Sequence, residues 1–269
     1  MSKFDLKEKL DKSIYRAYNV FSTIMYVLDY KSRRLIRKNV AFKDIHKGGR
    51  CFILGTGPSL SLLSPEEQKK LKTEVLFGVN SYHKADIASV LVPTYYALLD
   101  ERYRQDLSRV FAEVVERFAD APPTFIADYR AAGIVKNLGL SRPQGYIYAK
   151  RYPTDKIIDD ISRNIYVTMN VVSNCILVAA YMGFKEIYLL GCDYNAFCGA
   201  GGLGHCYDDK KDPDAIPYNL AFFLKYYWIT TEFHYLIAQF AKRKGIKIVN
   251  LTPTSLLDAY PRAPLSSVL

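Results

Sequence analysis

The sequence predicts an α/β fold built on a mostly parallel sheet, and three observations lead to this prediction. Short apolar segments alternate along the chain with longer segments that suit helices, an alternation typical of βαβ units with parallel strands. Of the 269 residues, 49% are hydrophobic, which is enough for a buried core. A glycine-rich turn, Gly55 to Ser59, follows the first apolar segment directly and suits the carboxyl edge of such a sheet.

The expected elements follow one another from residue 50 onward. The expected strands are Cys51–Leu54, Val75–Val79, Tyr95–Leu99, Thr124–Ala127, Glu186–Leu190 and Lys247–Leu251. The expected helices are Pro65–Leu71, Arg102–Phe118, Val171–Met182 and Leu220–Lys244. The first of these helices has the clearest start, because Ser64 can cap it, Pro65 suits its first turn and Glu67 completes a capping box.

Residues 1–47 are predicted to form a basic, amphipathic helical appendage. Apolar residues recur there at helical spacing, at Ile14, Tyr15, Tyr18, Phe21, Ile24, Met25 and Leu28. Residues 1–50 carry 13 Lys and Arg against five Asp and Glu, which accounts for +8 of the net charge of +10. Such a helix can lie on an anionic membrane surface, or it can pack on its own domain or on a second subunit. The sequence leaves these alternatives open.

Composition also argues against several classes of protein. The chain after residue 50 is close to neutral, so we expect no binding of nucleic acid. No stretch of about 18 uncharged apolar residues is present, and the charged start lacks the apolar run of a signal peptide. The five cysteines suit a reducing compartment better than a disulfide framework. We therefore expect a cytoplasmic protein without a membrane span.

Polar residues follow three of the expected strands and predict a ligand pocket. The turn Gly55-Thr56-Gly57-Pro58-Ser59 follows the first strand, Asn80 the second and Asp100 the third. Because ligands bind at the carboxyl ends of parallel strands, these residues are expected to line one site. Leu60 stands where the dinucleotide fingerprint needs a third glycine, and the Walker lysine is missing, so NAD and P-loop chemistry are disfavoured. A phosphate-binding turn of another kind and a purely structural tight turn stay open.

A second group of polar residues surrounds the expected helix at 171–182. Thr168 or Asn170 can cap this helix, and a helix start at the ligand edge favours an anion. Asp193 falls just past the strand that follows, at 186–190. These residues are therefore expected at the same edge of the sheet as the glycine-rich turn.

One of the four histidines is a candidate general base. His205 lies in the glycine-rich segment 198–205, and a histidine can deprotonate a sugar hydroxyl near neutral pH. From the residues alone, an exposed loop position for His205 is an equal alternative. His234 sits mid-helix among aromatic residues and is expected in the core. The spacing of Cys192, Cys198, His205 and Cys206 matches no regular zinc site, so no metal is expected.

Four motifs in this order resemble the bacterial sialyltransferases that use CMP-sialic acid. The motifs are FILGTGPSL, GVN, MGFKEIYLLGCDYN and GIKIVNLTPTSLL, and the resemblance covers residues 50–262. The set is also similar to a wider group of lipopolysaccharide Kdo transferases, flagellin-modifying motility factors and hydroxymethylpterin diphosphokinase-like proteins. The resemblance implies a single Rossmann-like nucleotide-binding domain of the GT-A-like sialyltransferase type over residues 48–269. It also implies a flexible lid around residues 194–218.

The resemblance implies roles for individual residues. The predicted catalytic residues are His205 as the base, with Asp193 and Tyr207. The residues predicted to bind the CMP-sugar are Gly55, Thr56, Gly57, Pro58, Ser59, Asn80, Asp100, Thr168, Asn170, Tyr194, Thr252 and Ser255. The chain departs from the sialyltransferases near Trp228, where their base would stand and where no histidine occurs. His205 matches instead a histidine of the motility factors.

The predicted function is that of an inverting, metal-independent glycosyltransferase. It would move a CMP-activated ulosonic acid, of the sialic, legionaminic, pseudaminic or Kdo type, to a cell-surface glycan or a lipid-linked acceptor. No cofactor is expected besides the CMP-sugar donor, and residues 1–40 would hold the enzyme on the inner face of the cell membrane. Two alternatives stay open: a diphosphokinase-like enzyme using ATP and Mg²⁺, with Asp100, Asp193 and Asp208 as its carboxylates, and a non-catalytic nucleotide-binding scaffold. A homo-oligomer stays open as well.

Overall fold

The core of the structure is one open parallel sheet. The computed structural model describes residues 3–154, 157–166, 168–198, 204–208 and 219–269, and within them eight parallel strands follow the order β6-β5-β4-β3-β2-β1-β7-β8. The strands are β1 (Arg50–Leu54), β2 (Leu76–Val79), β3 (Tyr95–Leu98), β4 (Thr124–Asp128), β5 (Gly145–Arg151), β6 (Asn164–Tyr166), β7 (Glu186–Leu190) and β8 (Lys247–Asn250). The strand order reverses at β1, the point where open α/β sheets bind ligands. The predicted Rossmann-like α/β fold is confirmed.

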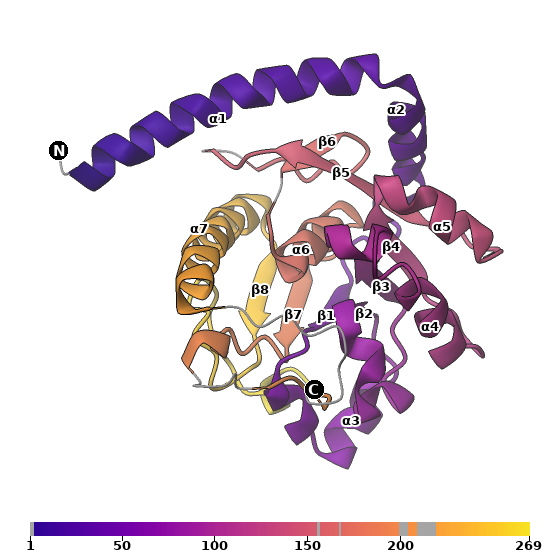
Figure 1. Cartoon of the computed structure of the whole chain (residues 1–269). Helices are drawn as coiled ribbons and strands as arrows, with labels where there is room; N and C mark the ends of the chain where they lie inside the picture. Colours follow the sequence, from indigo (N-terminus) through magenta and orange to yellow (C-terminus); the bar gives the residue numbers. More distant parts are fainter. Residues whose placement is uncertain (1–2, 155–156, 167, 199–203, 209–218) are drawn as a thin grey trace.

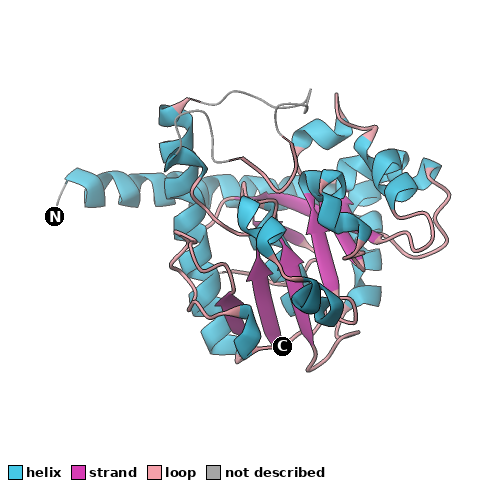
Figure 2. Ribbon diagram, turned by 90° about the horizontal axis from the view of Figure 1, so that it is seen from below, coloured by secondary structure: helices cyan, strands magenta, loops and turns pink. Residues whose placement is uncertain are grey.

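Helices cover both faces of this sheet (Figures 1 and 2). They are α1 (Lys3–Leu28), α2 (Tyr30–Arg37), α3 (Pro65–Leu71), α4 (Val110–Arg117), α5 (Ala132–Asn137), α6 (Val171–Tyr181) and α7 (Leu220–Lys244). Because side chains alternate along a strand, β1 feeds two cores. Phe52 and Leu54 pack with α4, whereas Cys51 and Ile53 pack with α6 and α7.

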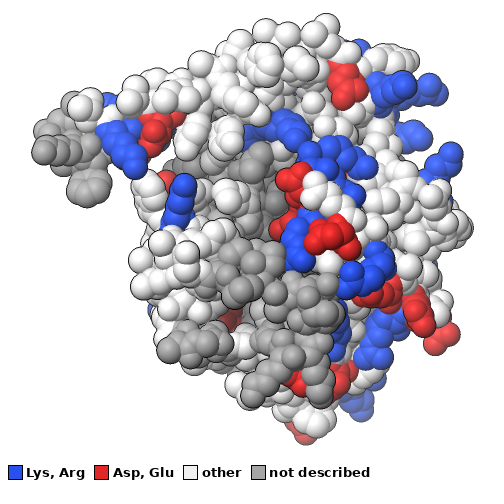
Figure 3. All heavy atoms as spheres, in the orientation of Figure 1, with Lys and Arg blue, Asp and Glu red and all other residues white. Residues whose placement is uncertain are grey.

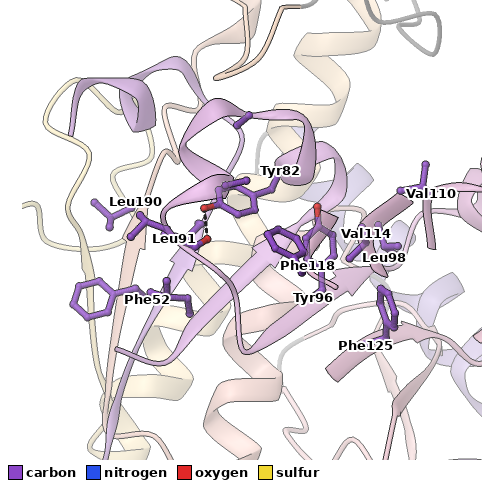
Figure 4. Packing of buried hydrophobic residues seen from close by; sticks show 14 of the residues in the cluster. Phe52, Tyr82, Leu91, Tyr96, Leu98, Val110, Val114, Phe118, Phe125 and Leu190 are labelled. Atoms are coloured by element: carbon purple, nitrogen blue, oxygen red, sulfur yellow. Dashed lines mark hydrogen bonds between the residues drawn. The ribbon is translucent and has the colours of Figure 1, made fainter. Parts of the chain in front are cut away.

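The core on the α4 side is rich in aromatic residues (Figure 4). Tyr96, Phe111 and Phe125 are fully buried there, and Phe111 and Phe125 pack edge to face with ring centroids 5.2 Å apart. Tyr82 is also fully buried, and its hydroxyl donates to the Leu91 carbonyl at 2.7 Å. The buried hydroxyl is therefore satisfied, and this core fixes the tips of β2 and β3 at which the site begins.

Most of the predicted elements are present. All six predicted strands form, α7 has the predicted bounds, and α3 carries the predicted capping box between Ser64 and Glu67. The predicted helix over residues 102–118 is wrong in its first half. A 3-10 turn at Glu101–Arg104 ends at Gln105, whose φ of −117° and ψ of −108° are not helical, and α4 begins only at Val110. Strands β5 and β6 and helix α5 were not predicted.

Helix α1 crosses the outside of the molecule above β5 and β6 (Figure 1). Polar side chains and tyrosine rings both make its contacts with the sheet, and among the rings Tyr26 packs on Tyr148 with centroids 5.0 Å apart. The Asn19 amide donates to the Tyr152 carbonyl at 2.9 Å and accepts from the Tyr152 N–H at 2.7 Å, and the Ser22 hydroxyl donates to the Lys150 carbonyl. The inner face of α1 is thus tied to β5. Of the predicted apolar stripe, Tyr15 stacks on Tyr152 with centroids 4.8 Å apart, whereas the other members are exposed, with Ile14 57% and Phe21 58% exposed.

The segment after α1 enters the core. Ile36 at the end of α2 is fully buried. The side chain of Asn39, also fully buried, donates to the carbonyls of Tyr146 and Ile161 and accepts from the Tyr146 N–H. This segment therefore packs as part of the α/β unit. None of the helices in the described part of the chain combines the length and the apolar character that crossing a bilayer requires.

Candidate active site

A cavity of about 850 Å³ lies at the carboxyl ends of the strands. Its wall is built from the residues after β1, β2, β3 and β7, from β4 and β5, and from the starts of α6 and α7. The volume is within the range of small-molecule sites. Of the predicted site residues, the cavity is lined by Gly55, Thr56, Gly57, Pro58, Asn80, Asp100, Thr168, Asn170, Asp193, Tyr194 and His205.

The glycine-rich turn after β1 packs tightly against the end of β7. The Gly55 N–H donates to the Leu190 carbonyl at 2.7 Å, and the Gly57 N–H donates to the Gly191 carbonyl at 2.9 Å. A β-carbon at Gly57 would lie 1.9 Å from Oδ2 of Asp193, far inside van der Waals contact. Packing against the end of β7 and Asp193 therefore requires glycine at these positions. The other side of the turn faces the cavity.

Asn80 presents an unsatisfied acceptor. It follows β2 with a φ of +47°, a conformation that asparagine tolerates better than most residues. Its carbonyl accepts from the Tyr96 hydroxyl at 2.8 Å, but its buried Oδ1 has no hydrogen-bond partner among the described residues. Asn174 on α6 has a buried Oδ1 in the same condition, and both residues line the cavity. Buried polar atoms without partners are uncommon, so these two amide oxygens are candidate ligand contacts.

The start of α6 faces the cavity. Asn170 is the cap, since its Oδ1 accepts from the Ser173 N–H at 3.1 Å. Thr168, the alternative cap, instead donates to the Asn170 carbonyl at 2.8 Å and accepts from the Asn174 amide at 2.6 Å. Asn170, Val171 and Val172 line the cavity, so the positive end of the α6 dipole is directed at its contents.

Three tyrosines form part of the cavity wall. Tyr194 follows β7, whereas Tyr226 and Tyr227 lie in the first turns of α7 and were not predicted. The only sequence signal for them was a pair of consecutive tyrosines in an aromatic helix. Burial raises the pKa of Tyr226 well above its usual value and that of Tyr227 to about 12. Both hydroxyls therefore keep their protons at neutral pH.

Tyr226 is placed to donate a hydrogen bond into the cavity. Its hydroxyl accepts from the Asn170 amide at 3.2 Å, so that contact uses an oxygen lone pair and not the hydroxyl proton. The Tyr227 hydroxyl likewise accepts from the Ala196 N–H at 3.2 Å. The protonated Tyr226 hydroxyl thus stands beside the positive end of α6, an arrangement that suits an anion.

His205 lines the cavity from its open side. Its ring is exposed and stacks on Tyr207 with centroids 4.8 Å apart and planes 5° apart. The Cys206 N–H donates to the Thr56 carbonyl at 2.9 Å, which ties segment 204–208 to the glycine-rich turn. Tyr207 is half-buried and is not part of the lining. Of the predicted lid, residues 199–203 and 209–218 lie outside the described residues.

His234 is buried in the core, as predicted, and also reaches the cavity lining. Its Nδ1 lies 2.9 Å from the Tyr260 hydroxyl, and burial lowers its pKa to about 3. Its Nε2 is buried without a partner among the described residues. His234 is therefore a neutral imidazole at physiological pH and cannot act there as a cation.

Several predicted site residues support the wall from behind. The Ser59 hydroxyl donates to Oδ2 of the buried Asp193 at 2.8 Å. Thr252 Oγ1 accepts from the Cys192 N–H at 3.1 Å, and the Ser255 hydroxyl donates to the Cys192 carbonyl at 2.6 Å. Ser59, Thr252 and Ser255 do not belong to the cavity lining, so their predicted contact with a donor stays a prediction.

One end of the cavity is charged. Asp100, Glu101 and Asp128 lie there with Arg130 and Lys150. The Arg130 guanidinium donates to the Asp128 carboxylate at 2.8 Å, so this pair is mutually neutralised. Within the described residues, no three His, Cys, Asp or Glu side chains gather in the arrangement of a metal site.

Comparison with known proteins places the chain in a family. A family model described as "6-hydroxymethylpterin diphosphokinase MptE-like" matches residues 19–197. The chain belongs to the MptE-like family. This confirms the predicted wider group, which included hydroxymethylpterin diphosphokinase-like proteins. No curated protein matches the MptE-like chain significantly.

Solved structures similar to this MptE-like chain include glycosyltransferases. One is the MAf glycosyltransferase from Magnetospirillum magneticum AMB-1, with a TM-score of 0.52 and 15% identity over 88% of this chain. The match covers 38% of the Magnetospirillum protein. Another is the sialyltransferase CstII from Campylobacter jejuni in complex with cytidine-5'-monophosphate, with a TM-score of 0.46 and 17% identity over 81% of this chain and 86% of that one. At these identities the likeness to the MAf enzyme concerns the fold.

Proposed function

We propose that this protein is a glycosyltransferase that moves a CMP-activated ulosonic acid to a glycan acceptor, with inversion and without a metal ion. The proposal is supported by one cavity that combines groups suited to a phosphate with amide oxygens suited to a nucleoside. The start of α6 and the Tyr226 hydroxyl suit a phosphate, and the orphaned amide oxygens of Asn80 and Asn174 suit the hydroxyl and amino groups of a nucleoside. The shared fold of the MAf glycosyltransferase supports the reaction class.

In this proposal the chemistry takes place between His205 and the α6 start. His205 removes the proton of the acceptor hydroxyl, whose oxygen attacks the anomeric carbon of the donor. The bond from that carbon to the phosphate oxygen breaks, and CMP leaves from the opposite face. Tyr226 and the α6 start stabilise the charge that develops on the leaving phosphate. Asp193 holds the glycine-rich turn in place through Ser59.

The proposal is tested by measuring CMP release in EDTA from CMP-activated sialic, legionaminic, pseudaminic and Kdo donors, with extracted lipid-linked glycans as acceptors. We expect release from one of these donors that depends on acceptor. His205→Ala should lower turnover about 100-fold or more while CMP affinity stays unchanged, because a base acts on the acceptor and not on the nucleotide. Equal losses of CMP binding and turnover would contradict the assignment of His205 as the base.

The description of the family supports a second candidate, a diphosphokinase that transfers from ATP. Asp100, Glu101 and Asp128 are the carboxylates at the charged end of the cavity that would face Mg²⁺. Asp128 is already paired with Arg130, and Asp208 is exposed outside the lining, which weakens this candidate. AMP formation that EDTA abolishes, without CMP release from any donor, would favour the diphosphokinase.

A further inference from the structure

Helix α1 carries an exposed apolar face along its described length. The side chains of this face are 40–72% exposed, and they are Leu6, Leu10, Ile14, Tyr18, Val20, Phe21, Ile24, Met25, Val27 and Leu28. At 100° per residue they occupy one side of the helix, opposite Asn19 and Ser22, which bind β5. Hydrogen bonds of Asn19 and Ser22 and the stacking of Tyr15 on Tyr152 anchor the inner side, so the fold holds the apolar side outward.

A second exposed stripe lies at the start of α7. Leu220, Leu224 and Trp228 are spaced four residues apart and are 60%, 52% and 54% exposed, and Tyr235 continues the stripe at 43%. The Lys7 ammonium of α1 lies 5.7 Å from the centre of the Trp228 ring, so the two stripes adjoin. We call the two together the α1–α7 surface. Exposed apolar patches of this extent mark interaction sites.

We propose that the α1–α7 surface docks the protein on an anionic lipid bilayer. Basic side chains accompany it, with Lys7, Lys9, Lys12 and Arg16 on α1 and Lys31, Arg33, Arg34 and Arg37 on α2. In Figure 3 the ridge formed by α1 at the top is mostly white, and blue side chains gather where α2 follows it. An apolar helix face flanked by Lys and Arg, with Trp and Tyr beside it, suits the boundary between headgroups and acyl chains.

Charge favours a bilayer over a second copy of the chain on this surface. Residues 1–50 carry 13 Lys and Arg against five Asp and Glu, so two such segments brought together would repel each other. Anionic headgroups instead attract each basic side chain near the membrane.

Docking in this way would bring the cavity to the level of the lipid headgroups. Tyr18 of α1 belongs both to the exposed face and to the cavity lining, and Phe222 and Phe223 of α7 line the cavity beside the Leu220 stripe. An acceptor carried on a lipid could then enter the cavity without leaving the membrane. This assignment of a lipid-linked glycan as acceptor rests on the proposed function, whereas the docking itself does not.

The test is co-sedimentation of the full chain with vesicles of phosphatidylcholine, with and without an equal part of phosphatidylglycerol. We expect the protein to sediment with the anionic vesicles and to bind neutral ones more weakly. The double variant Leu10→Glu with Phe21→Glu should lower the partition onto anionic vesicles about tenfold or more, because two exposed apolar side chains no longer insert. Val92→Glu, at an apolar residue 42% exposed outside the α1–α7 surface, is the matched control and should bind like the wild type.

Three outcomes would overturn the docking proposal: no binding to anionic vesicles, equal binding by the double variant, or light scattering that shows a dimer which the double variant converts to a monomer. The last would assign the surface to a second copy. Stabilisation of each variant by CMP is measured in parallel. If the wild-type protein fails to bind anionic vesicles while CMP still stabilises it, the docking alone is rejected, whereas vesicle binding by the wild type without CMP stabilisation rejects the proposed function alone.

Discussion

We expect substitutions at Asn80 and at Asn39 to have opposite effects on the stability of the protein and on its affinity for a ligand. Asn80 lines the cavity with a buried Oδ1 that has no partner among the described residues. Asn39 is fully buried and makes three hydrogen bonds to the backbone of Tyr146 and Ile161. The perturbation is Asn80→Gly, which keeps the positive φ of 47° accessible, compared with Asn39→Ala.

The magnitudes follow from what each side chain satisfies. Removing the Asn39 amide leaves two carbonyls and one N–H buried without partners, which costs about 3 kcal/mol or more of the free energy of unfolding. Removing the Asn80 amide deletes an oxygen that was already unsatisfied, so the free energy of unfolding should change by less than about 1 kcal/mol. The ligand instead loses one hydrogen bond, which weakens its affinity about tenfold.

Urea denaturation gives the free energy of unfolding, and calorimetric titration of CMP gives the affinity. We expect Asn39→Ala to lose stability with normal CMP affinity in the folded fraction, and Asn80→Gly to show the reverse. If Asn80→Gly were as unstable as Asn39→Ala, its Oδ1 would have a protein partner. If its CMP affinity equalled that of the wild type, the unsatisfied amide would not be a ligand contact.

Three further predictions test the wall of the cavity and its tyrosines. Gly57→Ala should lower the free energy of unfolding by about 1–3 kcal/mol, because its β-carbon would lie 1.9 Å from Asp193 Oδ2. Gly133→Ala, with no atom within 4 Å of the added carbon, should be stabilising in the same urea assay. Burial lowers the pKa of His234 from 6.5 to about 3. Between these two pH values the unfolded chain binds a proton at His234 that the native state does not bind. Lowering the pH through this range therefore lowers the free energy of unfolding. His234 alone should contribute a fall of up to about 1.4 kcal/mol per pH unit, so the His234→Gln profile should be shallower by that amount; identical profiles would contradict the burial of this ring. Tyr226→Phe should lower turnover about 100-fold if its hydroxyl donates to the leaving phosphate, and unchanged turnover would remove it from the mechanism.

The central part of the sheet could be predicted because its residues obey local rules. Strands such as β1 and β7 are continuous apolar runs, buried on both faces, and each is bounded by turn residues. Strand β6 has only three residues, and the chain between it and β5 has no apolar periodicity, so this edge of the sheet left little signal. In the segment after β3, Asp100 accepts from the Arg102 N–H and starts a 3-10 turn instead of the predicted helix.

The sequence predicted the site residues that directly follow strands. It did not predict those whose position at the cavity depends on tertiary contacts. Asn80 and Asp100 were found because parallel strands bring their carboxyl ends to one edge. Tyr226 and Tyr227 were missed because the spacing within α7 does not show which side of the helix meets the cavity. For α1 the periodicity predicted the helix, but not that Asn19 and Ser22 would anchor its polar side and leave the apolar side exposed.

The proposed function requires that the cavity bind a cytidine nucleotide without a metal ion. The most direct test is the thermal stability of the wild-type protein with CMP, CDP, UMP, UDP, GDP, AMP and ATP, each in EDTA and in Mg²⁺. A ligand at 100 times its dissociation constant adds about 2.7 kcal/mol of stability. We predict that CMP raises the melting temperature equally in EDTA and in Mg²⁺. Stabilisation by ATP only in Mg²⁺, or by UDP in place of CMP, would contradict it.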